Sequence, residues 1–368
     1  MIAIGNCKYF IGNELAEGRT ILVEDGKITS LDALAIPQGY ERFDGDGAYV
    51  SPGFVDLQIY GSGGNLFSAY PFAETLRQMD HDLIGKGTTG FLVCVATNTD
   101  EIVRDAIAAA KEYRQDAVGF LGLHLEGPFL NAKRRGAHVA AYIRKASLDE
   151  VKQLVEEADG VVKMMTLAAE LQDDAVIHYL LDQGIVLSLG HSDASYAEAN
   201  AAYDKGFKTT THLFNAMPSI HHRAPNLPAA VYTHPTAMAS IIADGRHVDF
   251  AMVSISQRLM GDRLFLITDA VTECNIGPYQ HQLSGDKFIT PDGTLSGSNI
   301  TLLDAVRNCV LHCGVSLPNA LKMASEYPAR LVDFPGLSAR LDVGNSADLV
   351  LISEELQLKK VMIKGSFR

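Results

Sequence analysis

The chain has 368 residues, of which 47% are hydrophobic and 20% charged, the balance of a soluble globular protein. Its 44 acidic residues outnumber its 31 Lys and Arg residues, and the formal net charge of −13 disfavours nucleic acid and anionic lipid as partners. No apolar run approaches the ~18 residues that a membrane-spanning helix needs, which excludes an integral membrane protein.

The N-terminus lacks the features of a secretory signal. Residues 1–6 carry no basic flank, and polar residues soon interrupt the apolar ones, so we expect a cytoplasmic location. The five cysteines are scattered and include no C-x-x-C pair. Neither a disulfide framework nor a thiolate zinc site is therefore expected.

Short strands separated by turns are predicted for about the first 50 residues. They are residues 1–4, 8–10, 20–24, 27–31 and 41–43, with turns at Asp25-Gly26 and at residues 44–47. Helical periodicity is absent from this stretch.

From residue 49 onward, apolar strands alternate with helices, a pattern typical of a parallel sheet. The predicted strands are residues 54–59, 91–96, 118–123, 161–166, 185–189, 207–211, 237–243 and 264–268. The predicted helices are residues 72–86, 101–114, 147–158, 173–183, 196–205, 302–312 and 318–323. A segment rich in Gly and Pro, residues 275–298, follows the last of these strands. About eight parallel strands are the number that closes a barrel.

The C-terminal stretch returns to short strands, at residues 344–352 and 358–364. The two termini therefore look like halves of one small β-domain. The predicted fold is α/β: a (β/α)8 TIM-like barrel over residues 52–334, beside a small β-sandwich built from residues 1–51 and 335–368.

Polar side chains follow four of the predicted barrel strands where each strand ends. They are Glu126, His191, His212 and Asp269. Because the carboxyl ends of barrel strands open onto one mouth, we expect these side chains to meet there. Two imidazoles and one carboxylate form a divalent-metal site with a position left open for water. Asp269 is then free to accept a proton from that water and to pass it to a leaving amine.

A structural role competes with this interpretation for each residue taken alone. A single strand-end His is more often a hydrogen-bonded core or loop residue, and Asp269 could be a turn or N-cap residue. Four such residues at four strand ends favour a catalytic metal site.

Seven short sequence blocks are spread along nearly the whole chain. They are residues 52–56 (PGFVD), 124–129 (HLEGPF), 190–192 (GHS), 211–217 (THLFNAM), 243–248 (ADGRHV), 268–270 (TDA) and 344–350 (GNSADLV). Together they resemble the N-acetylglucosamine-6-phosphate deacetylases of the amidohydrolase superfamily. The blocks around His212 and His247 are specific to these deacetylases, whereas the first and last occur across the superfamily.

The resemblance implies a role for each matching residue. Glu126, His191 and His212 hold the metal, Asp269 is the general base and then the general acid, and His138 polarises the acetamide carbonyl. Arg223 reaches the phosphate in a neighbouring subunit, which implies a homodimer. The residues expected to bind substrate are Ala137, His138, Asn215, Ala216, Arg223, Asp244, Gly245, Arg246, His247, Leu295, Ser296 and Gly297.

Two of these assignments have a plainer alternative. His221, His222 and Arg223 could form no more than a solvated loop. His247 could instead orient Glu126 or Asp269 without touching the substrate.

One departure from the superfamily concerns the metal. Many members carry His-x-His at the end of the first strand to bind a second ion, but this chain has Gln58 and Tyr60 there. Both are poor ligands, so we expect one divalent ion per subunit, with zinc as the first choice and iron, cobalt or manganese as alternatives. Related deacetylases with one metal already use Gln at the first place, whereas Tyr60 at the second is unfamiliar.

The resemblance implies hydrolysis of N-acetylglucosamine 6-phosphate to glucosamine 6-phosphate and acetate, in amino-sugar breakdown or cell-wall recycling. Two alternatives stay open: a deacetylase for a galactosamine isomer or an unphosphorylated N-acetyl sugar, and a silent barrel that only binds a sugar phosphate. Retention of all three ligands and of Asp269 argues against the silent barrel.

Overall fold

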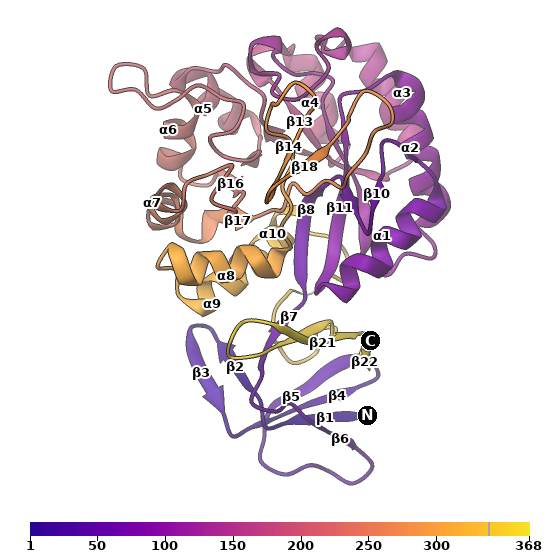
Figure 1. The fold of residues 1–368 in the computed structure, drawn as a ribbon, viewed down its shortest axis with the longest axis vertical. Coiled ribbons are helices and arrows are strands. Elements are labelled where there is room, and N and C mark those ends of the chain that lie inside the picture. Colours follow the sequence, from indigo (N-terminus) through magenta and orange to yellow (C-terminus); the bar gives the residue numbers. More distant parts are fainter. Residues whose placement is uncertain (338) are drawn as a thin grey trace.

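The computed structural model describes residues 1–337 and 339–368. A barrel surrounded by helices stands above a smaller β-unit, and both chain termini lie in the smaller unit (Figure 1). In the described part of the chain, no helix has both the length and the apolar character needed to cross a membrane.

Two sheets form the smaller unit. The first has the order β5-β4-β1-β6 and the second the order β22-β21-β20-β7-β2-β3, so strands from both ends of the chain share one sheet. Ile4, Tyr9, Val50, Leu349 and Met362 are buried together in a core of their own. The strands are β1 (Ile2–Gly5), β2 (Lys8–Ile11), β3 (Glu14–Glu17), β4 (Thr20–Glu24), β5 (Lys27–Ala33), β6 (Glu41–Asp44), β7 (Tyr49–Pro52), β20 (Leu349–Ile352), β21 (Leu358–Ile363) and β22 (Ser366–Phe367). The domain division at residues 51/52 and 334/335 stays a prediction.

Eight parallel strands form the barrel, in the order β17-β16-β15-β14-β13-β12-β11-β8. A parallel bridge between Ile59 and Ala270 joins the two ends of this order. Every residue of the first three strands in the chain is buried, as expected where helices cover the outer face of a sheet. The strands are β8 (Phe54–Ile59), β11 (Thr88–Ala96), β12 (Phe120–Glu126), β13 (Val162–Leu167), β14 (Val186–Leu189), β15 (Thr209–Thr210), β16 (Met238–Ile241) and β17 (Leu264–Leu266). The predicted fold class is confirmed.

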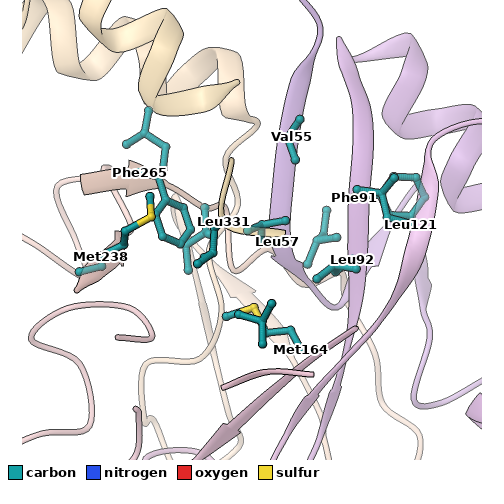
Figure 2. Close-up of a cluster of buried hydrophobic side chains, with 14 of the residues drawn as sticks. Val55, Leu57, Phe91, Leu92, Leu121, Met164, Met238, Phe265 and Leu331 are labelled. Carbon is teal, nitrogen blue, oxygen red and sulfur yellow. The ribbon is translucent and has the colours of Figure 1, made fainter. Parts of the chain in front are cut away.

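The inside of the barrel is packed with side chains. Leu57, Met164, Met238 and Phe265 converge from four different strands, and Leu331 joins them from a helix that follows the barrel strands (Figure 2). A filled interior leaves the mouth, at the carboxyl ends of the strands, as the place for chemistry.

Two helices begin at capping boxes. A reciprocal capping box of Ser195 with Glu198 starts α5, and one of Thr301 with Asp304 starts α8. Both helices have the bounds that the sequence predicted. The helices are α1 (Ala73–Gly85), α2 (Asp100–Tyr113), α3 (Leu148–Ala158), α4 (Asp174–Asp182), α5 (Tyr196–Lys205), α6 (Asn226–Thr233), α7 (Phe250–Met260), α8 (Leu302–His312), α9 (Leu317–Ala324) and α10 (Glu326–Val332).

Three helices are absent from the prediction, namely α6, α7 and α10. The first contains Pro228 and has no side-chain cap, and the last contains Pro328, so neither displays the usual start signals. In α7 the large apolar residues Ile255 and Leu259 face solvent and blur the periodicity. The segment after β17 also forms a small hairpin, β18 (Gln282–Ser284) with β19 (Lys287–Ile289), which was not predicted.

Candidate active site

The four strand-end residues of the sequence prediction lie at the mouth of the barrel, all buried. Glu126 is the last residue of β12, which continues beyond the strand end predicted at residue 123. His191, His212 and Asp269 follow β14, β15 and β17 in left-handed conformations, with φ of 46°, 33° and 53°. Such conformations are uncommon for residues other than glycine and concentrate at functional sites, and here they end the strands and redirect the side chains.

Neighbouring glycines allow this crowding. A Cβ on Gly190 would lie 2.7 Å from Thr211, so the turn into His191 has room for glycine alone. A Cβ on Gly297 would lie 2.4 Å from the carbonyl oxygen of Asp269. The segment after β17 can therefore press directly against the backbone of Asp269.

Glu126, His191 and His212 converge with spacing that suits one metal ion. Glu126 Oε1 lies 3.3 Å from His191 Nε2 and 3.0 Å from His212 Nε2, and the two imidazole nitrogens are 3.1 Å apart. Tetrahedral bonds of about 2.0–2.1 Å place neighbouring ligand atoms roughly 3.3 Å apart. The three donors thus fit a divalent ion, in keeping with a metal-dependent superfamily.

Hydrogen bonds fix the tautomers of two histidines. His191 Nδ1 donates to the Arg134 carbonyl at 2.8 Å, which leaves the lone pair on Nε2 toward the ligand cluster. His138 Nδ1 accepts the backbone N-H of Thr97 at 3.3 Å, so its proton is on Nε2 and points at Glu126 Oε2, 3.2 Å away. His138 therefore offers a hydrogen-bond donor at the cluster, whereas His191 offers a lone pair.

Gln58 and Tyr60 occupy the place where a second ion would need ligands. The Gln58 amide donates to Glu126 Oε1 at 3.0 Å and to Asp269 Oδ1 at 2.8 Å, and the Tyr60 hydroxyl donates to Glu126 Oε2. The Gln58 amide thus links the two carboxylates, and Tyr60 adds a second donor to Glu126.

Asp269 has the environment of a general base. Burial raises its pKa to about 7, and the nearby charge of Glu126 adds to the rise, while His212 and His247 oppose it. A carboxylate with a pKa near neutrality can both take up and release a proton, although a bound cation would lower this pKa.

Asp56 lies beneath the site on β8, fully buried. Its carboxylate accepts the backbone N-H groups of Gln58 and Thr268 and the Thr268 hydroxyl, but burial outweighs these bonds and raises its pKa to about 7. Because the folded chain keeps this proton to higher pH than the unfolded chain, the stability that the group contributes is present at acid pH and is lost as pH rises toward 7.

Asp56→Asn is expected to flatten the pH dependence of stability. Between pH 5 and 7 the free energy of unfolding of the original chain should fall relative to that of the variant, by about 1 kcal/mol per pH unit. Urea unfolding of both proteins across this range measures the difference. Two parallel curves would show that Asp56 is already ionised in the fold.

Most of the predicted site residues line one cavity at the barrel mouth. Besides the three ligand candidates and Asp269, this cavity is lined by Ala137, His138, Asn215, Ala216, His247, Leu295, Ser296 and Gly297. Residues from β12, β14, β15 and the segment after β17 are thus brought together from distant parts of the chain.

Four predicted substrate-binding residues lie away from this lining. Asp244, Gly245 and Arg246 precede His247 in the chain and do not line the cavity. The Arg246 guanidinium pairs with Asp286 at 2.5 Å. Arg223 is exposed in a loop before α6 that extends outward from the barrel (Figure 1). Within one chain, these four residues are therefore not placed to contact a substrate in this cavity.

His247 is held as a cation. Its Nδ1 donates to Asp244 and its Nε2 to the Ser296 carbonyl, each at 2.6 Å. Burial alone would lower its pKa, but the hydrogen bond and charge of Asp244 and the charge of Asp269 raise it above the usual value. Its hydrogen bonds join Asp244 to the segment after β17, so they do not orient Glu126 or Asp269.

Some residues of the cavity wall were not predicted from the sequence. Leu66, Ser68, Ala96, Val271, Tyr279 and His281 all line it. Burial lowers the pKa of His281 to about 4, and its Nδ1 lies 2.8 Å from Ser296 Oγ. Tyr279 and His281 belong to the Gly- and Pro-rich segment, where no strand-end pattern marks them.

Comparison with known proteins agrees with this geometry. The model of the amidohydrolase family matches residues 49–367. N-acetylglucosamine-6-phosphate deacetylase of Homo sapiens is 32% identical over 384 residues, which cover 98% of this chain and 93% of that protein. The Haemophilus influenzae deacetylase is 29% identical and covers 100% of this chain and 99% of its own.

Solved structures give the same result. The deacetylase from Pasteurella multocida superposes with a TM-score of 0.95 at 31% identity, covering 100% of this chain and 99% of its own. A Mycobacterium smegmatis deacetylase variant in complex with N-acetyl-D-glucosamine-6-phosphate superposes with a TM-score of 0.92 at 29% identity, covering 100% and 98%. The chain belongs to the amidohydrolase family and, within it, to the N-acetylglucosamine-6-phosphate deacetylases.

Proposed function

We propose that this protein hydrolyses the acetamide of N-acetylglucosamine 6-phosphate to glucosamine 6-phosphate and acetate. The observation that carries the proposal is the buried cluster of Glu126, His191 and His212, with Asp269 tied to it through Gln58. Its relatives named as this deacetylase support the choice of substrate.

Each residue has a distinct task. Glu126, His191 and His212 would hold one divalent ion, which supplies Lewis-acid polarisation of the amide carbonyl and of the attacking water. Asp269 takes the proton from that water as the water oxygen bonds to the carbonyl carbon. His138, whose Nε2-H lies at the cluster beside Glu126, would donate to the carbonyl oxygen, where negative charge develops. Asp269 then protonates the amine nitrogen as the C-N bond breaks.

We propose zinc as the ion, since two imidazole nitrogens and one carboxylate are typical of catalytic zinc sites. Iron, cobalt and manganese are the alternatives, because affinity order alone does not decide which metal is loaded. One ion per subunit accords with Gln58 and Tyr60 standing as donors where further ligands would be needed.

Acetate release from N-acetylglucosamine 6-phosphate tests the proposal. Metal-free protein is reconstituted in turn with zinc, iron, cobalt or manganese, and N-acetylglucosamine and N-acetylgalactosamine 6-phosphate are assayed beside the main substrate. Turnover that requires both metal and phosphate supports the assignment. If either comparison sugar is turned over faster, that sugar becomes the proposed substrate. Tight binding of the sugar phosphate without turnover would point to the silent barrel.

Among the residues that the structure describes, the lining of the cavity offers the phosphate His247 but neither Lys nor Arg. We propose a homodimer in which Arg223, exposed on its projecting loop, reaches the neighbouring active site. A guanidinium is the side chain that best matches phosphate, and it would offset the net charge of −13 locally.

Arg223→Ala is expected to raise KM for the phosphorylated sugar by about 10- to 100-fold, the range of a lost charge-assisted hydrogen bond. The rate on unphosphorylated N-acetylglucosamine should stay the same. Arg258→Ala, on the exposed face of α7, is the matched control. An unchanged preference for the phosphorylated sugar in Arg223→Ala would refute the phosphate contact.

A further inference from the structure

One part of the active-site cavity is an apolar wall made by Tyr60, Leu66, Ala96, Val271 and Tyr279. All five line the cavity, and each is at least nine-tenths buried. With Cys94 and Phe288 they form a hydrophobic cluster separate from the main barrel core. We call these five residues the acyl wall.

The polar atoms of the acyl wall are already engaged. The Tyr60 hydroxyl donates to Glu126, and the Tyr279 hydroxyl donates to the Thr97 carbonyl at 2.5 Å. The other three side chains are aliphatic. What this wall offers to a ligand is therefore carbon surface, which favours an apolar group and disfavours a hydroxyl or a phosphate.

The acyl wall lies across the barrel from Asn215 and Ala216, two of the residues expected to bind the substrate. Tyr60 and Ala96 stand at the ends of β8 and β11, and Val271 follows β17, the neighbour of β8 at the closure. Asn215 follows β15, and the strand order β11-β12-β13-β14-β15 places β15 on the far side of the eight-stranded ring from β11. The apolar wall therefore faces Asn215 and Ala216 across the barrel mouth.

The reacting groups lie between these two sides. Ala96 pairs in register with Glu126, Val271 comes two residues after Asp269, and the Tyr279 ring meets the His138 ring edge-on with centroids 6.3 Å apart. An amide is planar, and in its trans form the carbon chains on the carbonyl and on the nitrogen leave in opposite directions. A substrate whose sugar extends toward β15 must therefore direct its acyl chain at the acyl wall.

We propose that the acyl wall is the subsite for the acyl group and sets the length of acyl chain that the enzyme removes. This inference rests on the proposed deacetylase function and adds the residues that choose among N-acyl substrates. Leu66 and Val271 limit the depth of the subsite, and the small side chain of Ala96 leaves room for the acetyl methyl group.

The test measures kcat/KM for the N-formyl, N-acetyl, N-propionyl and N-butyryl derivatives of glucosamine 6-phosphate. The variants are Leu66→Ala, which enlarges the subsite, and Ala96→Val, which fills it. Leu130→Ala removes the same atoms from a buried leucine that does not line the cavity, and it serves as the matched control. Each ratio between two substrates comes from one protein preparation, so a loss of folded protein cancels.

We expect the original enzyme to prefer N-acetyl. Leu66→Ala should raise the ratio of N-butyryl to N-acetyl by at least about tenfold, the low end of what one methylene contributes in an apolar pocket. Ala96→Val should shift the preference toward N-formyl, and Leu130→Ala should leave the ratios unchanged.

The inference is overturned if both acyl-wall variants keep the original ratios, or if Leu130→Ala shifts them as strongly. Failure of the proposed function has a different signature, because the metal-loaded original enzyme would then turn over none of the four derivatives.

Discussion

Replacing Asp269 with Asn lowers kcat by about 10²- to 10⁴-fold, the expected contribution of a general acid and base. The amide of Asn can still accept the 2.8 Å hydrogen bond from Gln58, so the arrangement of the site survives. What it cannot do is take a proton from water or return one to the departing nitrogen. Initial rates of acetate release with saturating substrate and metal measure the effect.

Asp56→Asn is the matched control for that result. Both aspartates are fully buried and in both burial raises the pKa to about 7, but Asp56 bonds to Thr268 and Gln58 and does not line the cavity. Asp56→Asn should keep most of its kcat while its stability changes. If Asp269→Asn retained the original kcat with unchanged metal content, another residue would have to be the proton carrier.

Replacing Glu126 with Gln weakens metal binding by more than about 100-fold, because losing an outer partner of a ligand already costs 10- to 100-fold. The neutral amide keeps the volume of the side chain but removes the negative charge beside His191 and His212. Burial alone would raise the pKa of Glu126, yet the neighbouring imidazoles, among them His138 with its Nε2-H directed at Oε2, hold it well below the usual range. The side chain is therefore an anion, ready for a cation.

Competition with a chelator gives the metal affinity, and elemental analysis after dialysis gives the metal content. Activity should fall in proportion to the metal lost and should return at high metal concentration. Glu273→Gln, an exposed residue near the barrel mouth, controls for the change of charge and should bind metal as before. Unchanged affinity in Glu126→Gln would remove Glu126 from the ligand set.

From its strand pattern, the sequence could predict a site residue only where that residue follows an apolar strand. Glu126, His191, His212 and Asp269 each follow an apolar run, and parallel strands must open at one mouth, so the order of residues alone was enough to expect their meeting. Tyr279 and His281 gave no such signal, because the segment after β17 has no periodicity and only its folding over the mouth brings them to the cavity.

The sequence by itself determined the barrel, the shared β-unit of the two termini and the set of candidate metal ligands. These follow from local periodicity, caps and strand ends, which neighbouring residues along the chain decide. Helices α6, α7 and α10 could not be predicted from the sequence, because packing against the barrel stabilises them more than their own helix propensity does.

Tertiary structure alone decided the electrostatic state of the site. The raised pKa of Asp269, the paired protons of His247 and the donors that Gln58 and Tyr60 direct at the carboxylates all depend on burial and on contacts between distant segments. The same holds for the acyl wall, whose five residues come from three separate segments of the chain and are joined only when the barrel closes between β8 and β17. Solvation and side-chain proximity arise from the whole fold, so no local pattern in the chain encodes them.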